Sequence, residues 1–293
     1  MPADSIDIES AGKIYRETLL QTKKSLMEII QNDLKLKGEL DTFTSILEQA
    51  TEKIIQNWLS GKKYIRTLFM HRVMEDHYPQ KAIQLSLSID AIINILDDIL
   101  DEDLDNQTKT AYIVEFIRTM AIFTSKISDP YRAKMIERYF NKIISIAIGE
   151  KIYKNLIKNE TGAEKTKRLL LEVYTCRSLD MDIFVELPLL EIQFKSKDVD
   201  KMLILGRHFR ILNLIKKDID DIEHDKRGGI DTGVTLAFEK ENPKELIKSV
   251  ADKIVADSKQ TSLGSEECFA DKFKKMIEEE RHEIEDRLKS VKL

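Results

Sequence analysis

Apolar residues recur with the 3.6-residue period of an α-helix along most of the chain, and one segment carries them on nearly every side. This segment, residues 86–105, is predicted to be a helix that is buried all round. A polar stripe runs along it, mostly at steps of three or four residues that keep its members on one face: Asp90, Asn94, Asp97, Asp98, Asp101 and Asp105. A polar stripe on a buried helix needs something to face, so we expect a water-filled cavity with a cation at its acidic end.

The acidic end of this stripe is a candidate metal site. Asp97 and Asp101 are four residues apart, so their carboxylates can reach the same ion. Oxygen ligands favour magnesium, which keeps waters and bridges to phosphate. The alternative is an acidic helix end that is simply solvated. Carboxylates near a helix C-terminus oppose the helix dipole, however, so the arrangement costs stability unless a cation offsets it.

The other periodic segments predict an all-α protein. After two or three helices before residue 60, further helices are predicted over residues 112–125, 131–158, 164–187, 198–225, 244–258 and 266–293. Polar turns are predicted at residues 75–80, 159–162 and 226–233. Pro188 is expected to end the helix that precedes it. No shift in composition marks a boundary, so residues 1–293 are predicted to form a single helical domain.

Composition narrows the possible functions. Ten Gly and five Pro are few for 293 residues, which agrees with long helices. A net charge of -5 gives no reason to expect a nucleic acid as a partner. The two cysteines form no metal-ligand pattern, and the N-terminus lacks the apolar core of a signal peptide, so we expect a cytoplasmic location. No apolar run reaches the roughly 18 residues of a membrane span, so none is expected.

Two groups of basic residues are candidate anion contacts. Ser60-Gly61 interrupts the helical pattern, and Lys63 and Arg66 follow at the start of the next helix, where basic side chains favour an anion. The alternative is a solvated basic loop. Arg177 lies in a largely apolar tract, and its simplest interpretation is a pairing with a nearby acid such as Asp180.

Five landmarks occur in the order found in the trans-isoprenyl diphosphate synthase (polyprenyl synthetase) family, which this chain resembles between residues 60 and 237. Residues 61–66, GKKYIR, are similar to the basic GGKRxRP motif. Residues 97–101, DDILD, form a complete first DDxxD motif. The remaining landmarks are Gly149-Glu150 at the Gly-Gln pair, Arg177-Ser178 at the Lys-Thr pair, and residues 217–221 at the second DDxxD, followed by residues 231–236, which resemble the Asp-x-x-x-Gly-Lys-x-Thr-Leu stretch.

The resemblance implies a single bundle of long helices around a central cavity, of isoprenoid synthase type and usually dimeric. The implied catalytic residues and Mg²⁺ ligands are Asp97, Asp98 and Asp101 on one side of the cavity and Asp218 and Asp221 on the other. The implied substrate contacts are Lys63 and Arg66 for isopentenyl diphosphate and Arg177 for the allylic diphosphate, with Arg210 and Lys217 as substitute diphosphate contacts.

The implied reaction suits these residue types. Magnesium neutralises the charge that grows on the departing diphosphate, and a dry cavity protects the allylic cation from water. The double bond of isopentenyl diphosphate then attacks the cation and a proton leaves. No side-chain nucleophile is required, which agrees with a sequence that offers no Ser-His-Asp or Cys-His arrangement.

Four positions depart from the family pattern. Lys217 stands where the second motif has its first metal ligand, and residues 105–108 lack the arginine pair that grips diphosphate. Asp90 replaces a His or Gln that contacts isopentenyl diphosphate, and a carboxylate there would repel a diphosphate. The pair Arg177-Ser178 keeps the charge but not the geometry of Lys-Thr.

These departures leave three interpretations open. The first is an active prenyltransferase that takes an allylic and a homoallylic diphosphate. The second is a catalytically incomplete subunit of a two-component synthase, in which a partner chain supplies the full motifs. The chain is expected to form a homodimer or a heteromer with a related subunit. The third is a class I terpene cyclase-like enzyme, which needs metal and one diphosphate but no isopentenyl diphosphate.

Overall fold

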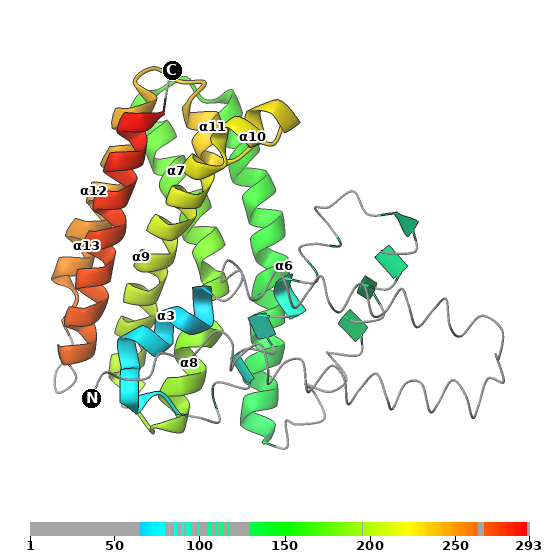
Figure 1. Ribbon diagram of the computed structural model, residues 1–293, viewed down its shortest axis with the longest axis vertical. Helices are drawn as coiled ribbons and strands as arrows, with labels where there is room; N and C mark the ends of the chain where they lie inside the picture. Colours follow the sequence, from blue (N-terminus) through cyan, green and yellow to red (C-terminus); the bar gives the residue numbers. More distant parts are fainter. Residues whose placement is uncertain are drawn as a thin grey trace. The chain divides into compact units, whose positions relative to one another are not determined.

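The structure is a computed structural model that describes residues 65–79, single positions between 82 and 117, and residues 129–262 and 267–291 except residue 195. The elements found in these parts are helices, and no strand occurs among them, so the prediction of an all-α protein is confirmed. No described helix is both long and apolar enough to cross a membrane. The chain divides into two compact units, Met1–Ala133 and Lys134–Leu293 (Figure 1). The single domain over residues 1–293 stays a prediction.

The first unit contains α3 (Ile65–Met74) and a following 3-10 turn, η2 (Glu75–His77), where the sequence predicts a polar turn. Every described position between residues 86 and 99 is helical. The buried side chains described in this segment are Ser86, Ile89, Asp90, Ile92, Ile93, Asn94 and Ile99, whereas Leu96 is half-buried and Asp105, at the end of the polar stripe, is exposed. The predicted burial of the segment on several sides is therefore confirmed for the buried positions named above.

The second unit is built around α9 (Ser196–Asp220), because its apolar residues point to several sides. The buried ones include Met202, Leu205, Phe209, Leu212, Ile215 and Ile219. The helices that pack against α9 include α7 (Ala163–Ser178), α8 (Asp182–Glu191), α12 (Pro243–Gln260) and α13 (Glu267–Ser290). Figure 1 shows α6 (Pro130–Asn159) running alongside them, with the short α10 (Ile222–Gly228) and α11 (Gly233–Ala237) beyond the end of α9.

The helix predicted over residues 164–187 is two helices. α7 ends at Ser178, a 3-10 turn follows (η3, Leu179–Met181), and α8 continues past Pro188 to Glu191. The prediction that Pro188 ends the helix is therefore wrong. Proline removes one helical hydrogen bond, but Leu187, Pro188 and Leu189 are all buried, and this packing outweighs the loss.

The helix predicted over residues 198–225 also divides. α9 ends at Asp220, and α10 begins two residues later at Ile222. α10 ends in front of Gly229, which has a φ of 65°, the left-handed conformation that glycine adopts most easily. The Gly-containing turn predicted at residues 226–233 thus begins three residues later than expected, and it leads into α11.

Candidate functional site

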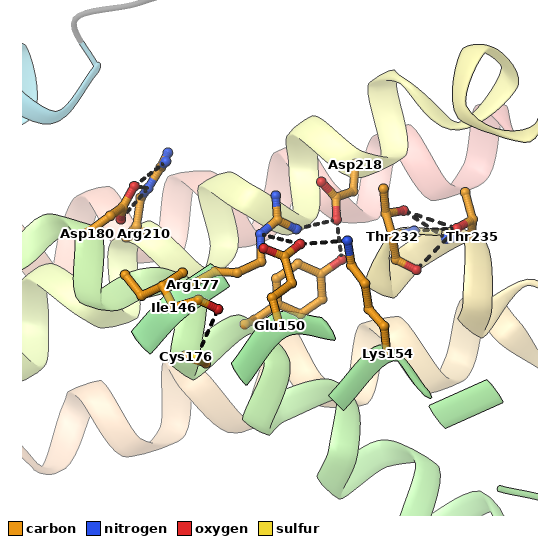
Figure 2. A network of polar contacts seen from close by, with 11 residues as sticks. Ile146, Glu150, Lys154, Cys176, Arg177, Asp180, Arg210, Asp218, Thr232 and Thr235 are labelled. Carbon is orange, nitrogen blue, oxygen red and sulfur yellow. Dashed lines mark hydrogen bonds and ion pairs between the residues drawn. The ribbon is translucent and has the colours of Figure 1, made fainter. Parts of the chain in front are cut away.

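Arg177, in the last turn of α7, is the centre of a charged network between α6, α7 and α9 (Figure 2). Its Nη1 atom donates a hydrogen bond of 2.8 Å to Oδ2 of Asp218, and its Nε atom lies 3.6 Å from Oε1 of Glu150. Glu150 also binds Lys154, one turn further along α6, at 2.7 Å. The partner proposed for Arg177 from the sequence was Asp180, whereas these contacts join it to acids 41 and 27 residues away.

The charges of this network support one another. Burial lowers the pKa of Arg177, but Asp218 and Glu150 outweigh that effect and raise it above its ordinary value. Asp218 is only 3 % exposed, so its buried carboxylate needs hydrogen-bond donors within the protein. The network therefore holds a fixed positive charge beside a buried carboxylate, and the side chain of Arg177 remains 16 % exposed.

Tyr174 is the second donor to Asp218. It is buried one turn before Arg177 on α7, and its hydroxyl donates to the same Oδ2 atom at 2.8 Å. The guanidinium carbon of Arg177 lies 5.6 Å from the centre of the tyrosine ring. Sequence reasoning missed Tyr174. The signal that could have found it is its spacing of three residues from Arg177, which places both side chains on one face of a helix.

The segment from residue 231 to 236 closes the network from another side. Thr232 and Thr235 form a capping box that starts α11, with the Thr235 amide donating to the Thr232 hydroxyl at 3.1 Å. The next residue, Gly233, has no room for a side chain, because a Cβ atom there would lie 2.7 Å from the Tyr174 ring. This landmark therefore packs directly on the tyrosine that binds Asp218.

The other charged residues of the second aspartate motif differ in their surroundings. Lys217 is exposed although Asp218 is buried, since adjacent helical residues point about 100° apart. Asp221 is exposed in the turn between α9 and α10. Burial raises the pKa of Asp225, and the charges of Asp218 and Asp221 add to this effect, so these three carboxylates lie within electrostatic reach of one another.

Arg210, a predicted diphosphate contact, is buried in a separate ion pair. Its Nη2 atom donates to Oδ2 of Asp180 at 2.7 Å, its Nε atom donates to Oδ1 at 3.0 Å, and its Nη1 atom donates to Asn213 at 2.9 Å. All three guanidinium nitrogens are thus used within the protein. The role of Arg210 as a diphosphate contact stays a prediction, and it would require this pair to open.

Arg66, a predicted contact for isopentenyl diphosphate, binds Asp90 inside the first unit. Its Nη1 atom donates to Oδ1 of Asp90 at 3.1 Å, while the hydroxyl and amide of Thr67 donate to Oδ2 at 2.6 Å and 3.2 Å. Burial raises the pKa of Asp90, and Arg66 and Thr67 partly offset this. At Asp90 the polar stripe therefore faces α3, and the water-filled cavity expected from the sequence stays a prediction.

The expected metal ligands are only partly described. Asp97, Asp98 and Asp101 of the first motif, and Lys63 of the basic motif, lie outside the described residues. Within the described parts, no group of three His, Cys, Asp or Glu side chains is arranged to hold a metal ion. Asp218 and Asp221 would supply carboxylates from one side only, so a complete site needs further ligands such as the first motif. Magnesium binding stays a prediction.

Comparison with known proteins does not test the resemblance to trans-isoprenyl diphosphate synthases. No protein-family model, no curated protein and no solved structure matches the chain.

Proposed function

We propose that this protein is a trans-isoprenyl diphosphate synthase-type transferase, which condenses an allylic diphosphate with isopentenyl diphosphate. One observation supports the proposal most. Glu150, Arg177 and Asp218 come from three separate landmarks of the family pattern, and they meet in one network of hydrogen bonds and ion pairs. The stretch that follows the second aspartate motif, around Gly233, packs on the same network through Tyr174. An ion pair that serves only packing would account for one of these contacts but not for the meeting of three landmarks.

The residues of the network suit the binding of an allylic diphosphate. Arg177 uses Nη1 and Nε in the contacts above, so Nη2 can donate to a phosphate oxygen. Asp218 accepts both of its hydrogen bonds at Oδ2, so Oδ1 can take a cation. Bound Mg²⁺ would neutralise the charge that develops on the departing diphosphate. The proposed reaction also needs an apolar surround that excludes water from the allylic cation.

A second candidate is the catalytically incomplete subunit of a two-component synthase, and two observations favour it. Arg66 is bound to Asp90, so its charge is neutralised where isopentenyl diphosphate would need it. Lys217 is an exposed cation at the position of a metal ligand. Such a chain would act in a heteromer with a related subunit. We propose that the first candidate works as a homodimer and that both candidates are cytoplasmic proteins.

The deciding experiment is mass spectrometry of the products formed by the purified protein with Mg²⁺, isopentenyl diphosphate and a panel of allylic diphosphates. Chain-elongated diphosphates support the transferase, and elongation only after a related subunit is co-expressed supports the incomplete subunit. A hydrocarbon or alcohol formed from the allylic diphosphate alone would instead indicate a terpene cyclase-like enzyme. The proposal is overturned if no product forms with the protein alone, with a co-expressed related subunit or from the allylic diphosphate alone, and if the protein does not bind inorganic diphosphate.

Lys217 offers a sharper test of the two candidates. If Lys217 only removes a metal ligand, then Lys217→Asp restores it and raises the elongation rate by at least about tenfold, the effect of one well-placed electrostatic contact. If Lys217 has become a diphosphate contact, the same change lowers the rate. Lys216→Asp is not a suitable control, because Lys216 binds Glu280 at 2.6 Å. Lys134→Asp, at an exposed position in α6, makes the same change of charge outside the motif.

A further inference from the structure

Tyr174 is a buried hydroxyl placed between a carboxylate and the start of a helix. On one side it donates to Oδ2 of Asp218 at 2.8 Å. On the other side its ring fills the space that a side chain at position 233 would need. Burial raises the pKa of Tyr174 well above its ordinary value, and the charge of Asp218 adds to this, so the hydroxyl keeps its proton and can donate.

The two donors to Asp218 fix which oxygen of the carboxylate is used. Arg177 and Tyr174 both donate to Oδ2, each at 2.8 Å, and they approach from side chains one turn apart on α7. Rotation of the carboxylate would break one of these charge-assisted hydrogen bonds, which are among the stronger ones in proteins. Oδ1 accepts neither bond and is held in one direction.

Gly233 determines whether the tyrosine can occupy this place. A Cβ atom at position 233 would lie 2.7 Å from Cε2, Cζ and the hydroxyl oxygen of Tyr174, a separation that requires the ring to move. Gly233 is itself held at the start of α11 by the capping box of Thr232 and Thr235. The segment after the second aspartate motif is therefore connected to Asp218 through the phenol.

We propose that Tyr174 is a positioning residue, which together with Arg177 fixes Oδ2 of Asp218 and so keeps Oδ1 available to a divalent cation carried by a diphosphate. Gly233 is the position that admits its ring. The inference rests on the proposed function, because only that function gives Asp218 a cation to bind. It adds a residue that the landmarks do not contain, and it explains why residue 233 has no side chain.

The test compares two buried tyrosines that each lose one hydrogen bond from the hydroxyl. Tyr174→Phe keeps the ring and removes the donor to Asp218. The matched control is Tyr139→Phe: Tyr139 is also buried, and its hydroxyl donates to the backbone oxygen of Asp180 at 2.8 Å. The probe is Mn²⁺ with inorganic diphosphate, and its binding is followed by electron paramagnetic resonance. Chain elongation is measured in parallel.

Tyr174→Phe is expected to weaken Mn²⁺ binding about tenfold or more, the ratio that corresponds to one hydrogen bond to a charged group. Tyr139→Phe is expected to leave binding unchanged while it lowers stability to a similar extent. Gly233→Ala should weaken binding as Tyr174→Phe does, and Gly228→Ala, where a Cβ meets only ordinary contacts with Ile230, should not. Equal binding in both tyrosine variants would overturn the proposal.

A second measurement does not depend on the metal. A double-mutant cycle of Tyr174→Phe and Asp218→Asn, read by urea unfolding, should give a coupling between the two side chains, and a cycle of Tyr139→Phe with Asp218→Asn should give none. Zero coupling for Tyr174 overturns the positioning role. If the wild-type protein binds neither Mn²⁺ nor diphosphate, the proposed function fails, and the cycle alone then decides whether Tyr174 orders Asp218.

Discussion

Two buried arginine–aspartate pairs occupy positions of the family pattern, one in each unit, and they differ in how completely the carboxylate is used. Asp90 accepts hydrogen bonds at both oxygens, from Arg66 at Oδ1 and from Thr67 at Oδ2, and is 0 % exposed. Within the described part of the chain, Asp218 accepts two hydrogen bonds, both at Oδ2. Both oxygens of Asp90 are therefore bonded, whereas Oδ1 of Asp218 can still accept a bond. We call Arg66–Asp90 the closed pair and Arg177–Asp218 the open pair.

The difference separates a structural pair from a candidate site. A buried carboxylate with both oxygens bonded has a donor at each acceptor atom, and any ligand would have to displace those donors. A carboxylate with one oxygen that accepts no hydrogen bond can bind a further donor or a cation there, and it keeps the hydrogen bonds at its other oxygen. Under the proposed function, the Arg66–Asp90 pair would therefore stabilise the first unit and the Arg177–Asp218 pair would bind the ligand. Each of the following variants tests one side of this contrast.

The largest effect is expected at the closed pair. Arg66→Met leaves Asp90 buried without its cation, and loss of one partner of such a pair costs about 3–5 kcal/mol. Urea unfolding measures this cost, and Asp90→Asn in the Arg66→Met background should recover most of it by removing the stranded charge. A loss below about 1 kcal/mol would show that the pair is not the buried contact that the contrast requires.

The open pair should respond in function as well as in stability. Arg177→Met leaves Asp218 with Tyr174 as its hydrogen-bond donor, so we expect a loss of about 3 kcal/mol in the free energy of unfolding. Under the proposed function kcat/KM should also fall about 100-fold or more, because a charge beside the departing diphosphate is removed.

Arg168→Met is the control for this variant, since Arg168 is exposed on the same helix, α7. It should change neither unfolding nor elongation kinetics. If Arg177→Met loses stability but keeps full kcat/KM, the Arg177–Asp218 pair is as structural as the Arg66–Asp90 pair, and the contrast between them fails.

The sequence is informative about helices and less so about which side chains meet. Periodicity alone predicts α6, α9, α12 and α13, because their apolar faces recur over several turns. It cannot show the 3-10 turn at residues 179–181, since the apolar pattern continues through it and through Pro188. The interruption is stabilised by packing between helices, which a local pattern does not record.

The candidate site shows the same limit. Arg177 and Asp218 are visible as charged residues in apolar helices, yet their pairing spans 41 residues and depends on how α7 and α9 pack. The neighbour in sequence, Asp180, instead binds Arg210 of α9. The resemblance placed Arg177 and Asp218 in one site, but it gave no hint of Tyr174, whose part depends on the space left at Gly233.

A smaller effect is expected where α11 supports the open pair. Thr232→Ala removes the hydroxyl that caps α11, which costs about 1 kcal/mol. Because Gly233 follows this cap and contacts Tyr174, the variant should also weaken Mn²⁺ binding in the presence of diphosphate. Thr232→Ser keeps the capping hydroxyl and should restore both quantities. A cap variant with reduced stability and unchanged binding would mean that α11 does not support Asp218.

The smallest effect concerns the acids beside the open pair, where Asp225 is buried close to Asp218 and Asp221. Its pKa is raised in the folded protein by burial, to which those two charges add, so the folded state favours the protonated form. The stability that this raised pKa contributes is fully present below the unfolded value near 3.8 and is lost as the pH rises through the folded pKa. Asp225→Asn should therefore stabilise the protein at pH 7 by about 0.5 kcal/mol, the scale of a mild substitution, and hardly at all at pH 3.

Melting temperatures of wild type and variant across that pH range measure this difference, and Asp271→Asn, at an exposed site on α13, is the control. Added Mg²⁺ sharpens the test, because a cation held by Asp218 and its neighbours would relieve the repulsion. With saturating Mg²⁺ the advantage of Asp225→Asn at pH 7 should then disappear or reverse. If Asp225→Asn stabilises the protein equally with and without Mg²⁺, these carboxylates bind no cation. Oδ1 of Asp218 would then have no ligand, and the Arg177–Asp218 pair would be structural.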